Sequence, residues 1–275
     1  MLVSELMLQQ TQVSRVLPKY TAFIDRYPTP SACASVPVGE ILRSWAGLGY
    51  NRRAVNLHRC AQAIVDHHGG RVPDGLDLLL ALPGIGPYTA RAVLAFAFER
   101  NVGIVDTNAA RVLARWQGGR LSSREVQQAA DEAVPRARSW LWNQGMLDLG
   151  ATVCTKRSPS CDACPAQSWC AWFVAGLRQP DPAVGSAGVT GRQSRFDGSD
   201  RQGRGRLVDA LRADGQVSRS RIAATAGWSA DEPRALRVAD TLVADGLAEW
   251  SVGGSLTFPT GVPHEPRNST ITSAT

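Results

Sequence analysis

The sequence has little lysine and no long apolar run, and both shortages limit what the chain can be. Lys19 and Lys156 are its two lysines, so arginine carries nearly all the positive charge of a 275-residue chain with a net charge of +6. No apolar run reaches the ~18–20 residues that a membrane-spanning helix needs. The start of the chain also lacks the basic region and apolar core of a secretory signal. We therefore expect a cytoplasmic protein with no membrane partner.

The remaining composition indicates a folded protein with a preference for anionic partners. A hydrophobic content of 44% excludes a wholly disordered chain, and the length suits about two domains of ~100–200 residues each. Arginine binds phosphate with a planar fork of donors, which favours a nucleic acid as partner. The codon bias of a GC-rich genome explains the arginine excess equally well.

Alternating strand patterns are scarce before residue 175, and helical periodicity is frequent. Short Gly and Pro turns separate these stretches. We expect an all-α domain over residues 1–175, with helices at 2–24, 38–46, 53–67, 76–82, 88–98, 108–116, 123–134 and 137–149.

The composition changes after residue 175. Residues 176–204 are rich in Gly, Ser, Pro, Asp and Arg, which predicts a mobile linker. Helical stretches at 207–211, 220–226 and 235–245 precede alternating runs at 248–252 and 255–258, which is the element order of a winged helix. We expect a winged-helix-like domain over 205–259 and a frayed tail over 260–275.

Four cysteines lie within seventeen residues near the end of the first domain. They are Cys154, Cys161, Cys164 and Cys170. Clustered cysteines in an intracellular chain usually bind metal. Zinc sites usually pair two knuckles across a longer loop, so the spacing favours a 4Fe–4S cluster, with zinc as the alternative.

The cysteine spacing resembles that of the helix-hairpin-helix DNA glycosylases of the endonuclease III and MutY type. The resemblance covers residues 2–175. It implies a mainly α fold, made of a six-helix bundle and an iron–sulfur loop subdomain at 154–170. The winged-helix-like α+β domain would follow this fold.

The segment Leu82-Pro83-Gly84-Ile85-Gly86 separates two predicted helices. Glycines allow a tight hairpin and a close backbone approach, and the N–H groups that open the second helix can hold a phosphate. By itself the segment could be a plain helix–helix turn. With the resemblance, Gly84 and Gly86 are expected to form a DNA-binding hairpin.

Two carboxylates match the catalytic positions of the MutY type. The resemblance implies that Glu5, within Ser4–Thr11, protonates the adenine ring as a general acid. It also implies that Asp106 stabilises the positive charge at the sugar C1′ and that Asn108 positions the water. Without the resemblance, Glu5 would be a surface residue favoured by the helix dipole and Asp106 a helix N-cap.

Tyr88 occupies the position that matches the lysine nucleophile of endonuclease III. A tyrosine cannot form the Schiff base that leads to strand cleavage. We therefore expect a monofunctional glycosylase that leaves an abasic site. The alternative role for Tyr88 is an ordinary half-buried helix residue.

Five further residues match family positions that contact the duplex. Gln10, Thr11, Leu48 and Tyr50 are expected to press into DNA opposite the extruded base, which offsets part of the unstacking cost. Gln144 is expected to pair with the edge of adenine. The alternative for Leu48 and Tyr50 is a buried hydrophobic corner.

The chain departs from the family in two places. The family has about thirty residues before the segment that matches Leu2–Gln10, so we expect that a preceding segment is missing because the start has been placed too late. The hydrolase-like C-terminal domain of many MutY-type enzymes is also missing. Residues 205–258 resemble the ending of some actinobacterial relatives. The arginines of this chain in and just before that region could contact phosphate or form a solvated face.

The sequence therefore predicts a base-excision repair enzyme that acts at the bacterial nucleoid as a monomer. It would remove adenine mispaired with guanine or 8-oxoguanine from double-stranded DNA. The alternatives are a thymine glycosylase for T/G mismatches and a non-catalytic iron–sulfur DNA-binding regulator. Gln9, Gln10 and Gln144 favour adenine. The intact pair of Glu5 and Asp106 favours an enzyme.

Overall fold

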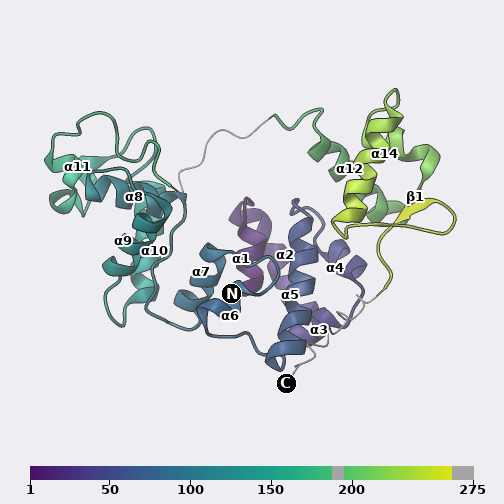
Figure 1. Ribbon diagram of the computed structural model, residues 1–275, viewed down its shortest axis with the longest axis horizontal. Helices are drawn as coiled ribbons and strands as arrows, with labels where there is room; N and C mark the ends of the chain where they lie inside the picture. The colour runs from purple at the N-terminus through teal and green to yellow at the C-terminus, as the bar shows by residue number, and fades with distance from the viewer. Residues whose placement is uncertain (188–194, 262–275) are drawn as a thin grey trace, which may run out of the picture. The chain divides into compact units, whose positions relative to one another are not determined.

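The computed structural model describes residues 1–187 and 195–261, and the described chain is mainly helical (Figure 1). Its helices are α1 (Leu2–Leu8), α2 (Val13–Arg26), α3 (Pro30–Ala34), α4 (Val38–Ser44), α5 (Arg52–His68), α6 (Leu76–Leu80), α7 (Pro87–Ala97), α8 (Thr107–Gln117), α9 (Ser123–Ala133), α10 (Ser139–Thr152), α11 (Ala171–Val174), α12 (Asp200–Asp214), α13 (Ile222–Ala226) and α14 (Glu232–Ala244). Its strands are β1 (Gln216–Ser218), β2 (Glu249–Trp250) and β3 (Ser255–Thr257). None of these helices is both long enough and apolar enough to span a bilayer.

The chain forms two compact units that interleave along the sequence. One unit contains residues 1–6 and 72–194, and the other contains residues 7–71 and 195–275. The second unit therefore joins an early part of the chain to its C-terminal part. The domain boundaries predicted at 175, 204 and 259 divide the chain differently, and they remain predictions.

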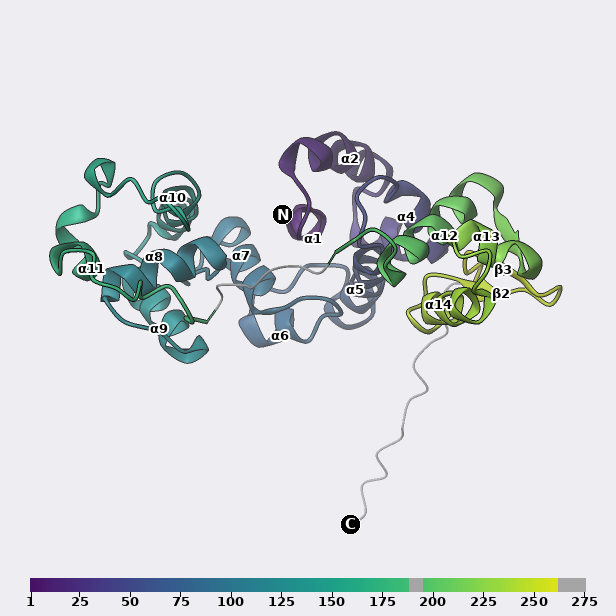
Figure 2. The ribbon, with the colours of Figure 1, turned by 90° about the horizontal axis from the view of Figure 1, so that it is seen from above.

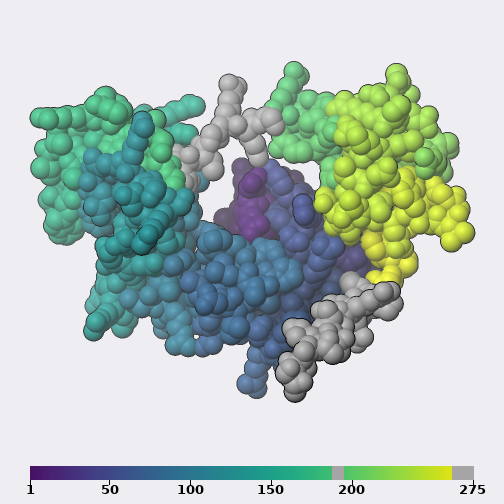
Figure 3. Space-filling model, viewed as in Figure 1, coloured from purple at the N-terminus to yellow at the C-terminus, as the bar shows by residue number. Residues whose placement is uncertain are grey.

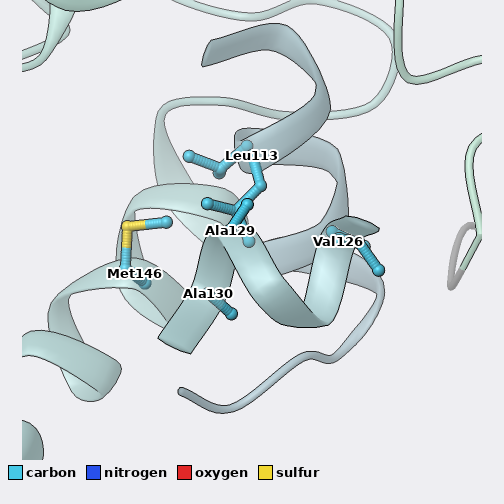
Figure 4. Close-up of a cluster of buried hydrophobic side chains, with 7 residues drawn as sticks. Leu113, Val126, Ala129, Ala130 and Met146 are labelled. Atoms are coloured by element: carbon cyan, nitrogen blue, oxygen red, sulfur yellow. The ribbon is translucent and has the colours of Figure 1, made fainter. Parts of the chain in front are cut away.

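The core of the first unit lies between α8, α9 and α10. Leu113, Val126, Ala129, Ala130 and Met146 converge there (Figure 4). The ends of these helices have clear local causes. The hydroxyl of Ser122 caps α9 in a capping box with Glu125, and Gly118 ends α8 in the left-handed conformation that favours glycine.

The second unit combines α2 to α5 with a small three-helix and three-strand arrangement. Phe23 packs against Tyr27 and Trp45 with ring centroids 4.9 and 6.4 Å away. The sheet is antiparallel in the order β1-β3-β2, with Leu256 opposite both Val217 and Trp250. Figures 1 and 2 show α12 beside α4 within this unit.

Most of the predicted helices are confirmed, with ends that differ by a few residues. The single helix expected over 2–24 is wrong, because the chain breaks between α1 and α2. Gln10 there adopts a φ of 56°, which a helix cannot contain. The short helices α3 and α11 and the strand β1 were not predicted.

The segment expected to be a linker holds more order than its composition suggests. Helix α12 begins at Asp200, inside the predicted 176–204 range. The amide of Ala187 donates to the carbonyl of Leu121 at 2.9 Å, and Asp181 forms an ion pair with buried Arg115 at 2.7 Å. Residues 188–194, and all but the first two residues of the predicted tail, lie outside the described chain.

Candidate functional site

Glu5 and Tyr88 meet in the first unit. Glu5 lies in the middle of α1 and is only 8% exposed, and Tyr88 lies in the first turn of α7. The Tyr88 hydroxyl donates a hydrogen bond to the Glu5 carboxylate. Burial raises the pKa of Glu5 above its usual value, although the tyrosine bond opposes this. The carboxyl therefore holds its proton at a higher pH than an exposed glutamate.

Asp106 lies at the start of α8, where its Oδ1 accepts from the amides of Asn108 at 2.8 Å and Ala109 at 2.6 Å. The N-cap role considered from the sequence is therefore present. Burial raises the pKa of Asp106, and the cap bonds pull it back down. Burial also raises the pKa of Tyr88, and the charges of both Glu5 and Asp106 add to this. Tyr88 thus lies within electrostatic reach of both carboxyls.

Arg111 orients Asn108 and was not predicted from the sequence. Its Nη2 donates to Asn108 Oδ1 at 2.8 Å. The other end of that amide therefore turns toward Asp106, with which Asn108 also forms a side-chain hydrogen bond. Arg111 also donates to the carbonyls of Gly150 at 2.5 Å and Cys154 at 2.8 Å. A Cβ at Gly150 would lie 2.6 Å from Asn108 Cβ, so only glycine allows this close approach.

The predicted hairpin connects α6 to α7. Gly84 has a φ of 78°, in the left-handed region that favours glycine. Gly86 is the N-cap of α7, with no side chain closing that end, and Pro87 follows at the first helical position. Both glycines are exposed while Ile85 between them is buried. The apolar side chain anchors the hairpin, and its backbone faces outward.

The four clustered cysteines line one small cavity together with Arg115, Trp172 and Phe173. None of the four forms a disulfide. Arg115 is 2% exposed and donates from Nη1 to Cys154 Sγ at 3.3 Å and to the Thr155 carbonyl at 2.8 Å. Burial raises the pKa of the Cys154 thiol, and Arg115 opposes this rise. A cation beside a thiol favours the thiolate that binds metal.

The donor set of this cavity consists of four cysteine sulfurs from one loop. Within residues 1–187 and 195–261, no three His, Cys, Asp or Glu side chains are arranged to share one metal ion. Four thiolates are the donor set of a 4Fe–4S cluster and also of a zinc site. The kind of side chain therefore fits the cluster that the cysteine spacing favours.

In the second unit, Arg53 organises the connection between α4 and α5, which we call the 47–51 turn. This arginine is 7% exposed. Its guanidinium donates to the carbonyls of Leu48 and Gly49, each at 3.1 Å, and to the Thr11 hydroxyl at 2.9 Å. It also donates to the carbonyls of Met7 at 2.7 Å and Gln9 at 2.6 Å. Burial lowers its pKa to about 10, a value at which it stays charged at neutral pH.

The predicted duplex-contacting residues of this unit differ in exposure. Gln10 is exposed, and Thr11 is half-buried with its hydroxyl donating to the Leu48 carbonyl at 3.2 Å. Tyr50 is 45% exposed and has a φ of 45°. Leu48 is 2% exposed, which favours the hydrophobic-corner interpretation for that residue. Arg53 therefore joins the Gln10–Thr11 segment to the 47–51 turn.

Gln144 lies on α10 of the first unit and is half-buried. Its Nε2 donates to Asp148 Oδ1 at 3.0 Å, one helical turn further along. The amide that was expected to pair with adenine is therefore engaged within its own helix. Its role toward a base remains a prediction.

The hairpin, the carboxyl pair and the cysteine loop together define a class of DNA repair protein. Residues 3–136 match the family described as HhH-GPD superfamily base excision DNA repair protein. The adenine DNA glycosylase of Mycolicibacterium smegmatis is 44% identical over 257 residues, which cover 92% of this chain and 85% of that protein. The human adenine DNA glycosylase is 41% identical over 175 residues, 61% of this chain and 32% of that protein. The chain belongs to the family of these MutY-type adenine DNA glycosylases.

Solved structures confirm the fold. A thermostable thymine-DNA glycosylase aligns with a TM-score of 0.58 and 30% identity, over 63% of this chain and 83% of that one. A trapped endonuclease III–DNA covalent intermediate aligns with a TM-score of 0.57 and 27% identity, over 64% of this chain and 84% of that one. The predicted helix-hairpin-helix glycosylase fold is therefore correct.

Proposed function

We propose that this chain is an adenine DNA glycosylase that acts on adenine opposite guanine or 8-oxoguanine in double-stranded DNA. It hydrolyses the N-glycosidic bond and leaves an abasic site. Its adenine glycosylase relatives support the class of reaction. The observation that carries the proposal is the buried Glu5 bonded to Tyr88, with Asp106 within electrostatic reach.

Glu5 acts as the general acid. Adenine is a poor leaving group as an anion, and a proton on its ring lets it depart as a neutral base. The acid must therefore be protonated near neutral pH. The burial that raises the pKa of Glu5 supports this state. The hydrogen bond from Tyr88 fixes the direction of the carboxyl group.

Asp106 stabilises the positive charge that develops at C1′ as the base leaves. An ionised carboxylate in a partly desolvated site is well suited to this role. The two cap bonds from the α8 amides favour its ionised form. Asn108, oriented by Arg111, positions the attacking water.

Position 88 holds a tyrosine where endonuclease III has its lysine nucleophile, which supports a glycosylase without strand cleavage. A phenol cannot form a Schiff base with the sugar. Tyr88 therefore takes a hydrogen-bonding role toward Glu5. The enzyme would release adenine and leave the strand intact.

Duplex binding is shared among three segments. The backbone N–H groups at the hairpin of Gly84 and Gly86 hold a phosphate. Gln10, Thr11 and Tyr50 fill the space that the extruded base leaves. The protein works as a monomer.

Cys154, Cys161, Cys164 and Cys170 would hold a 4Fe–4S cluster. When bound, the cluster would crosslink the 154–170 loop, and the hydrolysis itself needs no redox step. Arg115 donates to one of its sulfur ligands, and Arg111 links the Cys154 carbonyl to Asn108. The loop is thereby joined to the residue that positions the water.

The decisive experiment is single-turnover base release from duplexes with adenine opposite 8-oxoguanine, adenine opposite guanine, and thymine opposite guanine. We expect release of adenine from the first two duplexes only. Borohydride should trap no covalent complex. Thymine release would identify a T/G glycosylase, and tight binding without any base release would identify a regulator.

A further inference from the structure

The C-terminal elements, α12 to β3, pack on α4 and α5 of the same unit. Arg43 stacks over the Phe258 ring at 5.3 Å. A Cβ at Gly39 would lie 3.0 Å from Phe258 Cβ, so α4 approaches the end of β3 closely. In the space-filling view the yellow-green C-terminal elements lie against the violet-blue helices of residues 7–71 (Figure 3). These elements therefore share one packed body with the 47–51 turn.

One arginine of α12 reaches both sides of the 47–51 turn. Arg212 donates from Nε to the Leu42 carbonyl at 3.1 Å, before the turn, and from Nη2 to Asn51 Oδ1 at 2.7 Å, at its end. Its side chain is 12% exposed, and Asp209 accepts from Nη1 at 2.6 Å and fixes the guanidinium. A half-buried guanidinium with three hydrogen-bond acceptors is a rigid support.

The side chain of Asn51 does not cap helix α5, although Asn51 lies at its N-cap. It stands at the N-cap of α5, where asparagine usually accepts from the first amides of a helix. Its side chain makes no such cap bond here. Its amide oxygen accepts from Arg212 instead. The start of α5 is thus tied to the C-terminal elements rather than to its own backbone.

The turn is strained enough to need support from two sides. Gly47, Gly49 and Tyr50 have φ values of 85°, 69° and 45°, and a positive φ at a tyrosine is unfavourable. Arg53 holds the turn through the Leu48 and Gly49 carbonyls. Arg212 ties Asn51, at the end of the turn, to the Leu42 carbonyl within the preceding helix α4. Two separate arginines therefore fix one short connection.

Several arginines of the C-terminal elements form ion pairs within these elements. Arg204 pairs with Asp245, Arg221 with Asp214, and both Arg234 and Arg237 with Asp200. These pairs reduce the charge that the elements offer to a phosphate backbone. A contribution to DNA binding through the turn therefore requires no basic face on the elements themselves.

We propose that Arg212 is a positioning residue, through which the C-terminal elements hold the 47–51 turn in the shape that contacts the strand opposite the extruded base. The inference rests on the duplex role proposed above for Tyr50. It gives the C-terminal elements a function in duplex recognition that requires no direct contact with DNA. Its basis is the pair of bonds from Arg212 to Leu42 and Asn51.

The test compares Arg212→Ala, Arg212→Lys, Asn51→Ala and the Arg212→Ala/Asn51→Ala double variant. The probe is a duplex with 2′-fluoro-2′-deoxyadenosine opposite 8-oxoguanine, which resists hydrolysis. We expect Arg212→Ala and Asn51→Ala each to raise Kd about five- to tenfold, and the double variant to bind no more weakly than either single variant. Arg212→Lys should recover part of the loss. Amide hydrogen exchange over residues 47–52 should speed up in each variant.

Arg43→Ala is the matched control, since it removes a contact of the same interface away from the turn. We expect it to lower Tm comparably but to change Kd less than about twofold. Wild-type exchange and binding in Arg212→Ala, or fully additive losses in the double variant, would overturn the inference. Tyr50→Ala tests the duplex role itself. If Tyr50→Ala binds normally while Arg212→Ala speeds exchange, the proposed duplex role fails, and with it the effect of Arg212 on binding.

Discussion

Ionisable side chains are buried both at the carboxyl site of the first unit and at the 47–51 turn of the second unit, but burial has a different effect in each. Around Tyr88, burial raises the pKa of Glu5, so a proton is kept where the chemistry needs one, and the cap bonds counter the same effect at Asp106, which acts ionised. Around Arg53, the guanidinium stays charged and donates to backbone carbonyls. In the first region burial tunes reactivity, whereas in the second it fixes shape.

The difference has a physical origin in the two kinds of group. A carboxyl can give up its charge by taking a proton, and each unit by which burial raises its pKa lowers the free-energy cost of protonation by about 1.4 kcal/mol. A guanidinium remains protonated near neutral pH, so it must be satisfied by acceptors. Substitution in the carboxyl region should therefore change the rate most. Substitution in the arginine region should change binding and stability.

The largest expected effect comes from Glu5→Gln. The amide keeps the size of the side chain but cannot donate a proton to the adenine ring. We expect the single-turnover rate of adenine release to fall by about 10²–10⁴-fold, while binding of an adenine/8-oxoguanine duplex changes little. Chemical-quench assays and duplex titration measure the two quantities.

Glu40→Gln is the matched control for this change, because Glu40 lies in an exposed ion pair with Arg26 and Arg43. It should release adenine at the wild-type rate. Retained activity in Glu5→Gln would show that another group supplies the proton. Equal losses of duplex binding and of rate in Glu5→Gln would show that Glu5 also maintains the conformation of its region. The proposed difference between the two regions would then be wrong.

Next in size is Arg53→Ala. This change leaves the carbonyls of Met7, Leu48 and Gly49 without their buried donor. We expect a loss of about 2–4 kcal/mol in the free energy of unfolding, measured by urea denaturation. Duplex binding should weaken more than the rate of base release at saturating enzyme.

Arg52→Ala is the control, since Arg52 is the neighbouring residue of α5 and its side chain is 67% exposed. Its loss should cost less than about 0.5 kcal/mol. A similar cost for both variants would mean that the acceptors of Arg53 find water readily. A lower rate of base release with unchanged duplex binding would instead mean that Arg53 contributes to the chemical step.

The sequence predicted the first region better than the second. Asp106 opens a helix twenty residues after Gly86, and Tyr88 lies two residues after Gly86, so the resemblance to the family could be drawn from short motifs and their spacing. The two regions also share one missed feature, the break between α1 and α2. Gln10 has the φ of 56° that breaks the helix, yet nothing in its residue type requires this value.

The arginine contacts were missed for a definite reason. Arg53 donates to carbonyls up to 46 residues away, and Arg212 to a carbonyl 170 residues away. Backbone carbonyls are present at every residue and leave no mark in a sequence. For Arg212 the structure adds one sign, an asparagine at the start of α5 whose side chain does not cap the helix. The sequence alone does not show this, because the missing cap bond is seen only in the fold.

The pH dependence of adenine release sharpens the comparison further. Glu5 acts in its protonated form, and burial raises its pKa, so the rate should fall about tenfold per pH unit above that raised pKa. Asp106 acts ionised, and burial raises its pKa as well, so a second fall should occur at acid pH above the usual range of aspartate. Single-turnover rates from about pH 5 to 9 measure both limbs. A rate that keeps rising at alkaline pH would contradict the role of Glu5.

The smallest expected effect concerns Arg115, a buried arginine that does have a carboxylate partner. Asp181 accepts from its Nε and Nη2 at 3.1 and 2.7 Å. Although burial opposes it, Arg115 lowers the pKa of Asp181, so the pair is charged at neutral pH. Asp181→Asn keeps the shape and one acceptor, so the loss in unfolding free energy should be about 1–2 kcal/mol.

The same variant separates shape from chemistry in the cysteine loop. Arg115 also donates to Cys154 Sγ at 3.3 Å, so a looser guanidinium should let the cluster decay a few-fold faster in air, as followed by its visible absorbance. Adenine release per cluster-containing molecule should stay unchanged, because Asp181 orients Arg115 and touches neither carboxyl of the reaction. Unchanged decay would show that the sulfur contact needs no carboxylate behind it. Slower base release at full cluster occupancy would instead mean that Arg115 affects the rate of the reaction. Its contact with Cys154, which in turn accepts from Arg111, would be the route.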